Sequence, residues 1–293
     1  MSSQENYRLL ELERWMQSFP DSMVEELKTE TPPFICSETV LIILDESCGE
    51  SPEEFSREVL QKLHHTTTIK TLVFYPLDNA GELYGPVFDF ANFSKPVAKT
   101  LPNLEEIYIE EIRAKNFKIE LKSVKKLHLT RINRSYEERN KWALKLPNLR
   151  ELYMVDHTPP DAKLGRAFIN SPLIEVFYSH KGWLSTKGNT PFYLPNCKNF
   201  CIRRVEIACK LQLYLPRVEK VDLSANWPLE SLVFLEEGHE KHAEWNHDQG
   251  TPQSRFKLCA QNAIFSKSVK KELRGNQRVM NRGKVAKQLI PDN

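Results

Sequence analysis

One short pattern recurs along the chain and constrains its fold more than any other feature. The segment from Leu101 reads Leu-Pro-Asn-Leu-Glu-Glu-Ile-Tyr-Ile, and the segment from Leu146 reads Leu-Pro-Asn-Leu-Arg-Glu-Leu-Tyr-Met. Segments that keep the order apolar-x-x-apolar-x-apolar give seven copies, whose first apolar residues are Ile69, Leu104, Val124, Leu149, Leu173, Cys197 and Val218. After a first step of 35 residues, successive copies are 20 to 25 residues apart. Repetition at such a period predicts stacked supersecondary units, each too small to bury its own apolar face.

The pattern also predicts what each unit contains. In a short strand, alternate side chains point to the same face, so the apolar positions of each copy would face one core and the residues between them would face outward. Ile107 and Leu152 are therefore expected to be fully buried. Stacked copies would form a parallel sheet, with strands in chain order near residues 72–74, 107–109, 127–129, 152–154, 176–178, 200–202 and 221–223.

These segments resemble the leucine-rich-repeat superfamily over residues 40–235. Residues 218–226, Val-Glu-Lys-Val-Asp-Leu-Ser-Ala-Asn, match its signature including the asparagine, which the other copies lack. The resemblance is therefore to the irregular members of the superfamily, similar to the repeats of F-box-type proteins. It implies an α/β fold, a leucine-rich-repeat solenoid with a parallel β-sheet on its concave face.

The part before the repeats is expected to be helical. Residues 1–35 would form a helical N-terminal cap, because Tyr7–Phe19 has near-helical apolar periodicity and Pro20 ends it. The solenoid would occupy residues 36–235. Its first strand is expected at Val40–Leu44, a continuous apolar run suited to a buried strand. A helix is expected from Ser51 to His64, since serine at the cap, Pro52 at the first turn and Glu54 form a strong start signal.

The part after the repeats divides into three segments. Residues 228–235 are expected to form one more strand that closes the stack, and residues 236–254 are typical of a polar loop. Residues 255–293 form a basic tail, which begins with a plausible helix over 256–274 that Gly275 would end. The tail carries ten Lys and Arg against two acidic residues, a net charge of +8, whereas residues 1–254 carry 31 bases and 37 acids. Such an asymmetry indicates an acidic body with a basic arm.

Nothing in the sequence indicates an enzyme. No serine lies in a Gly-x-Ser-x-Gly elbow, and no glycine-rich phosphate loop occurs, so no catalytic residue and no cofactor are predicted. The loop with His239, His242 and His247 is rich in carboxylates, but its spacing matches no metal signature, and no metal is predicted. The six cysteines lack zinc spacing and are expected to be free thiols that pack as small apolar residues.

The outward positions of the predicted strands form the candidate binding surface. Aromatic or imidazole rings occupy the central outward position of four successive copies, namely Tyr108, His128, Tyr153 and Phe177. Glutamates stand two residues earlier in three of these copies, at Glu106, Glu151 and Glu175. Exposed aromatic residues in a row either pack on one another or anchor a partner. The neighbouring glutamates favour a protein partner over nucleic acid on this face.

The predicted function is a non-enzymatic scaffold that binds another protein on the concave face. The alternative is RNA or another acidic partner bound by the basic tail, through Lys267, Lys270, Lys271, Arg274, Arg278, Arg282 and Lys284. A second alternative is the substrate-recognition subunit of an F-box-type ubiquitin ligase. Residues 19–27 resemble the opening of that motif, but only about twenty residues separate them from Val40, too few for its remaining helices.

The sequence gives no sign of a membrane segment. No run of about 18 apolar residues occurs, and the N-terminus lacks the basic and apolar regions of a secretory signal. The expected location is the cytoplasm or the nucleus.

Overall fold

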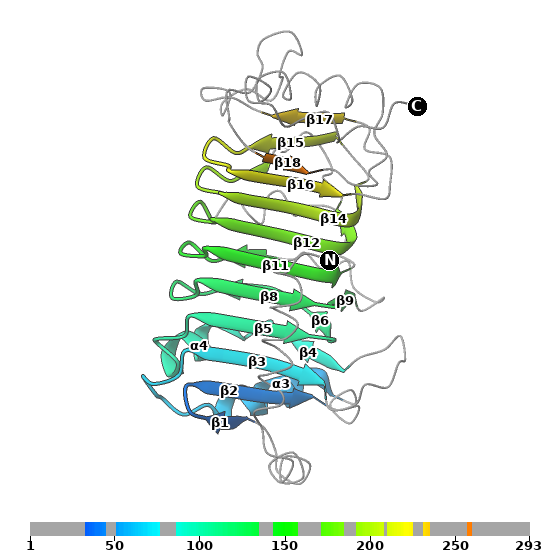
Figure 1. Ribbon diagram of the computed structural model, residues 1–293. Coiled ribbons are helices and arrows are strands. Elements are labelled where there is room, and N and C mark those ends of the chain that lie inside the picture. Colours follow the sequence, from blue (N-terminus) through cyan, green and yellow to red (C-terminus); the bar gives the residue numbers. More distant parts are fainter. Residues whose placement is uncertain are drawn as a thin grey trace.

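A computed structural model describes nine stretches of the chain, which are residues 33–44, 51–76, 86–134, 143–157, 171–184, 192–207, 210–224, 231–234 and 257–259. Ten strands form one sheet, here called the main sheet, in an order that follows the chain (Figure 1). Every neighbouring pair is parallel except the first, β1 with β2. The strands are β1 (Phe34–Cys36), β2 (Thr39–Leu44), β3 (Thr71–Pro76), β5 (Glu106–Glu110), β8 (Lys126–Thr130), β11 (Glu151–His157), β12 (Val176–Leu184), β14 (Asn199–Ile207), β16 (Lys220–Ser224) and β18 (Lys257–Cys259).

The predicted strands and their chain order are confirmed, and so is the mostly parallel α/β character of the fold. The strand expected at 228–235 is confirmed as β17 (Ser231–Phe234), which belongs to a smaller sheet and not to the main one. One expectation about the C-terminal end is wrong. The helix expected from residue 256 does not begin there, because β18 pairs in parallel with β16 as the last strand of the main sheet.

Short strands line the return path from one main-sheet strand to the next. They form three small parallel sheets. Their members are β4 (Val87–Asp89), β6 (Arg113–Lys115) and β9 (Asn133–Arg134); β7 (Lys118–Glu120) and β10 (Ala143–Lys145); and β13 (Phe192–Tyr193), β15 (Lys210–Tyr214) and β17.

Two helices occur in the described residues, both near the start of the sheet. Helix α3 (Pro52–Lys62) confirms the helix expected after Ser51, but the Ser51 side chain does not cap it. The Ser51 carbonyl instead accepts a hydrogen bond from the Phe55 N–H at 3.0 Å. Helix α4 (Ser94–Thr100) has no counterpart among the sequence expectations.

The core lies between the main sheet and the return segments, as the alternation of each strand predicts. Ile107 and Leu152 are fully buried, and they belong to one cluster with Phe117 and Leu144 of the return path. Beside α3 and α4 this core is aromatic, with ring centroids of Phe74, Phe88, Phe90, Phe93 and Phe117 packed 4.9–5.8 Å apart. The face of the main sheet opposite this core is called the outward face below.

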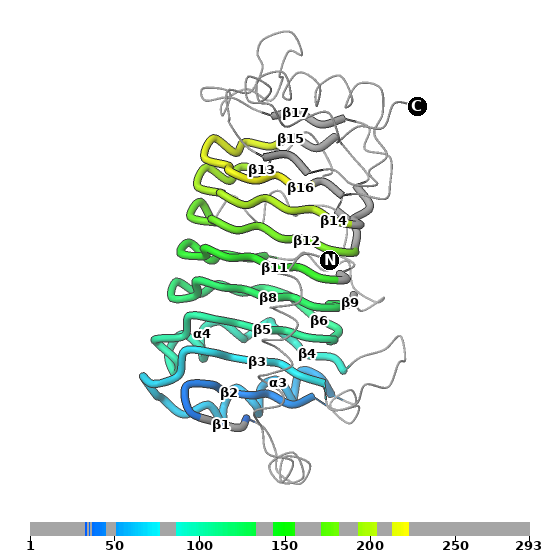
Figure 2. Tube along the Cα trace, in the orientation of Figure 1, coloured from blue at the N-terminus to red at the C-terminus, as the bar shows by residue number. Residues whose placement is uncertain are grey.

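The turns that lead into the strands lie above one another along one edge of the sheet (Figure 2). The asparagine of the Leu-Pro-Asn-Leu pattern joins these turns. Asn103 Nδ2 donates to the Thr67 carbonyl at 2.8 Å, and Asn148 Nδ2 donates to the Lys122 carbonyl at 2.7 Å. In the Leu-Pro-Asn-Leu pattern, the asparagine therefore links one turn to the preceding one by a hydrogen bond. The first and last leucines of the pattern are buried in the core.

The opposite edge contains sharp corners at residues with positive φ. Glu111 and Arg131 follow directly after β5 and β8, with φ of 48° and 49°. Their side chains form an ion pair with each other. The left-handed conformation turns the chain toward the return strands, a position where glycine would be the usual residue.

Three expectations concern residues outside those described. They are the helical cap expected over residues 1–35, except for its last residues, where Phe34 and Ile35 belong to strand β1; the polar loop at 236–254; and the tail beyond residue 259. Within the described residues, no helix is long and apolar enough to cross a membrane.

Candidate functional site

A column of rings runs along the outward face. Strand register places Tyr108 beside His128, His128 beside Tyr153, and Tyr153 beside Tyr178. The ring centroids are 5.6, 5.6 and 6.1 Å apart along this series. These four residues are called the ring column below. Its spacing follows from the separation of directly paired strands, which places equivalent side chains about 4.7–4.9 Å apart.

Two glutamates are fixed to the ring column by hydrogen bonds. The Tyr108 hydroxyl donates to Glu106 Oε2 at 2.7 Å, and the Tyr153 hydroxyl donates to Glu151 Oε2 at 2.8 Å. Between them, Lys126 places its Nζ 3.7 Å from Glu106 Oε2 and 5.3 Å from the centroid of the Tyr108 ring. An ammonium group over an aromatic face is held by the ring quadrupole. The column is thus bordered by carboxylates and already accommodates one cation.

The rings differ in exposure. Tyr108, His128 and Tyr178 are half-buried, whereas Tyr153 is only 2% exposed. The sequence places Tyr153 correctly on the outward face but predicts it as a freely accessible anchor, which its burial contradicts. Tyr153 therefore supports its neighbours, and the accessible ring surface belongs to the other three residues.

The ends of the column have a different character. Toward the N-terminal strands, Val73 and Leu41 occupy the equivalent outward positions and are nearly fully covered. Toward the C-terminal strands, Asp222 is buried and accepts two hydrogen bonds from the Arg203 guanidinium, at 2.9 and 2.5 Å. The accessible rings are thus confined to the middle of the sheet.

Phe177 does not belong to this column, contrary to the sequence prediction. It pairs with Leu152 on the inward side, is fully buried, and stacks on Phe200 with centroids 5.0 Å apart and planes at 13°. The prediction began this copy at Leu173, one residue too early. Because side chains alternate along a strand, a shift of one residue exchanges the two faces. Tyr178 takes the outward place instead.

The correct register has a signal in the sequence. Proline stands two residues before the first apolar position in four copies, for example Pro147 before Leu149 and Pro195 before Cys197. Applied to Pro172, the same spacing selects Ile174, which is fully buried, over Leu173, which is 37% exposed. The entrance proline is therefore a better register marker than the first apolar residue.

Glu175 also lies elsewhere than predicted. It sits at the strand entrance, where its carboxylate accepts hydrogen bonds from Arg150 at 2.7 Å and from Lys198 at 2.8 Å. The same position in the other segments carries charges of both signs, and Lys70–Glu38 and Lys125–Glu105 pair at 2.7 and 2.6 Å. These exposed pairs contribute little each to stability. Glu175 therefore belongs to the entrance edge, and Val176 takes its predicted place beside the rings.

A third outward position, two residues after each ring, was not identified from the sequence. It carries Tyr75, Glu110, Thr130, Val155 and His180. Burial raises the pKa of Glu110 above its ordinary value, although the Arg131 guanidinium acts in the opposite direction. Burial also raises the pKa of Tyr75, with a further contribution from the Glu110 carboxylate. Glu110 thus adds a partly desolvated carboxyl group next to the rings.

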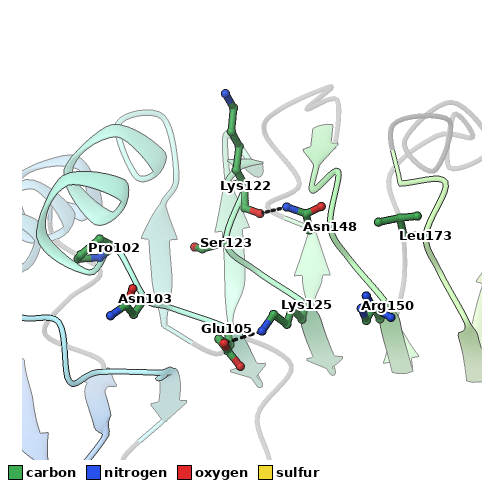
Figure 3. A pocket seen from close by; sticks show the side chains of 9 residues that line it. All are labelled: Pro102, Asn103, Glu105, Lys122, Ser123, Lys125, Asn148, Arg150 and Leu173. Atoms are coloured by element: carbon green, nitrogen blue, oxygen red, sulfur yellow. Dashed lines mark hydrogen bonds and ion pairs between the residues drawn. The ribbon is translucent and has the colours of Figure 1, made fainter.

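A surface hollow among the described residues lies away from the rings. It is a shallow pocket of about 270 Å³ on the entrance edge, lined among others by Asn103, Lys122, Lys125 and Leu173 (Figure 3). Its polar groups are engaged with each other, since Lys125 contacts Glu105 and Asn148 donates to the Lys122 carbonyl. It has the character of a groove between turns.

The described residues contain no cluster of three or more His, Cys, Asp or Glu that could hold a metal ion. Burial raises the pKa of the Cys197 thiol to about 12, so this thiol is a packed side chain. Other candidates lie outside the described residues, namely His239, His242, His247 and the tail residues Lys267, Lys270, Lys271, Arg274, Arg278, Arg282 and Lys284.

Comparisons with protein-family models, with curated proteins and with solved structures found no match to this chain.

Proposed function

We propose that the chain is an irregular leucine-rich-repeat solenoid and a non-enzymatic scaffold, whose outward face is the concave surface that binds a partner protein. The parallel order of the main sheet supports this architecture, because each copy of the pattern contributes one strand at the predicted place. The observation that carries the function is the ring column, whose accessible members are Tyr108, His128 and Tyr178. Aromatic side chains of this kind dominate the energetics of protein interfaces.

The competing interpretation is that the rings only stabilise the sheet. Cross-strand ring pairs contribute roughly 0.2–1 kcal/mol each, and such packing is compatible with binding. One feature favours a binding role. Tyr108, His128 and Tyr178 each keep part of their surface exposed on the outward face, although the sequence could place threonine or valine there, as it does at Thr130 and Val155 in the neighbouring position.

The test is an affinity capture that compares two variants of the full chain. The first is Tyr108→Ala/Tyr178→Ala, which removes accessible ring surface and spares the covered Tyr153. The second is Lys270→Glu/Lys271→Glu, which reverses charge in the tail. The scaffold proposal expects the first variant to lose the captured protein, by about 2 kcal/mol or more for each true hot spot, and the second to keep it. Retention by the first variant and loss by the second would replace the proposal with recognition through the basic tail.

A further inference from the structure

The outward face carries an uneven distribution of charge around the rings. On β5, β8 and β11 its outward positions hold three carboxyl groups, those of Glu106, Glu110 and Glu151, against the single ammonium group of Lys126. This group, together with the rings of Tyr108 and His128, is called the acidic ring patch below. Its members come from three adjacent strands and lie within one or two strand spacings of each other.

We propose that the acidic ring patch binds a partner through a basic segment that presents Lys or Arg side chains. This inference rests on the proposed function, and it names the chemistry of the partner. Covering the patch removes water from its carboxyl groups, and a buried charge is tolerated only when a partner charge or hydrogen-bond donor replaces that water. An acidic partner would add like charge beside these carboxyl groups, and an apolar partner would offer no donor in place of the displaced water. A cationic side chain satisfies the carboxylates and the ring faces together.

Lys126 provides an internal example of the contact. Its Nζ lies 3.7 Å from Glu106 Oε2 and 5.3 Å from the centre of the Tyr108 ring. One cation therefore already uses both a carboxylate and a ring at this place. Glu151 lies two strands from Glu106, with Lys126 between them in the strand register. A basic segment that crosses these strands can place a separate cationic side chain beside each carboxylate.

Hydrogen bonding prepares the carboxylates for this role. The Tyr108 hydroxyl donates a hydrogen bond to one oxygen of Glu106, and the Tyr153 hydroxyl donates one to Glu151. Because both glutamate side chains are already held in place, they lose little conformational freedom when a partner binds. Glu110, the third carboxyl group, is partly desolvated before any partner arrives. Burial has raised its pKa, and a cation at this position would reverse that effect.

The experiment is a selection of short random peptides on the immobilised full chain, run in parallel on matched variants. Glu106→Gln/Glu151→Gln removes two charges but keeps an acceptor oxygen for each tyrosine hydroxyl. The control, Glu58→Gln/Glu219→Gln, removes two charges at exposed positions outside the patch. Thermal melting establishes that both variants fold.

The proposal expects selected peptides to be enriched in Lys and Arg on the wild type and on the control. It expects the Glu106→Gln/Glu151→Gln variant to bind them at least about tenfold more weakly, since each lost charge-assisted contact is worth roughly that factor. Selection of peptides without Lys or Arg enrichment, equal binding by the patch variant, equal loss in the control, or no selection at all would overturn it.

Two further variants separate this inference from the function on which it rests. Tyr108→Ala/Tyr178→Ala could lose the selected peptides while Glu106→Gln/Glu151→Gln retains them. In that case the outward face binds a partner as proposed, but the proposal that the partner segment is basic is wrong. If Lys270→Glu/Lys271→Glu strongly increases peptide binding, the patch is occupied by the basic tail of the chain itself, and a separate basic partner is contradicted.

Discussion

Replacing Phe177 or Tyr178 by alanine distinguishes the two faces of the main sheet at adjacent positions. Phe177 is fully buried and stacks on Phe200 at 5.0 Å, so Phe177→Ala leaves a cavity in the core. Core Phe to Ala substitutions cost about 3–5 kcal/mol. Tyr178 is half-buried, with its ring 6.1 Å from Tyr153 and 6.3 Å from His180. Loss of two such ring pairs costs about 0.5–2 kcal/mol.

Urea unfolding followed by circular dichroism measures the two free energies of unfolding under the same conditions. The difference between the variants is expected to be at least about 1 kcal/mol, with Phe177→Ala the less stable. Stability of a folded domain is commonly about 5–15 kcal/mol, so Phe177→Ala would remove a large share of it. Equal losses, or a greater loss for Tyr178→Ala, would refute the register and with it the composition of the ring column.

Three other predictions concern single groups. The Cys197 thiol, whose pKa burial raises to about 12, should react with a thiol reagent in the native protein only at the rate of unfolding; rapid labelling at pH 8 would contradict its burial. Glu111→Gly should be more stable than Glu111→Val by about 1–2 kcal/mol in thermal melts, because φ is 48° there and a β-branched residue resists it; equal stability would contradict this. Glu110 binds its proton more tightly in the folded state, so its ionisation costs stability as the pH rises above 4.5. Glu110→Gln should therefore stabilise the protein at neutral pH and not at pH 4, and the same gain at both values would exclude that cause.

The sequence predicts the main sheet well because one pattern encodes both its strands and its turns. Ile107 and Ile109 alternate as a strand with one buried face requires, Leu104 lies in the turn before them, and each proves buried. The pattern fails at Leu173 because two adjacent residues, Leu173 and Ile174, are both apolar. Periodicity cannot choose between them, whereas the structure buries Ile174 fully and leaves Leu173 exposed.

The return path was not predictable from periodicity. Strand β6 has the sequence Arg-Ala-Lys and only three residues, of which Ala114 alone is buried. Its pairing with β4 and β9 depends on how segments distant in the sequence stack on one another, and the residues of β6 alone do not predict that stacking. Strand β18 is a similar case, because its pairing partner β16 lies far back in the sequence. The positive φ of Arg131 was not predictable either, because the usual sequence signal for a left-handed backbone is glycine and this position carries arginine.

The candidate site was predictable in part. Tyr108, His128 and Tyr153 follow from the alternation within their strands, and the structure brings their rings together. The sequence could not reveal that Tyr153 is covered or that Glu110 is partly desolvated, because burial depends on residues that are distant in the chain. Glu110 was missed for a simpler reason, since the predicted strand ended one residue before it.

Photocrosslinking from the ring column tests the proposed binding surface most directly. The photoreactive residue p-benzoylphenylalanine replaces Tyr178 in the full chain, and a second protein carries it at Lys118, an exposed position of the return strand β7. Illumination in cells that make the protein should attach a partner protein at position 178 and not at position 118. A partner attached at 118 and never at 178 would contradict the proposal that the outward face is the binding surface.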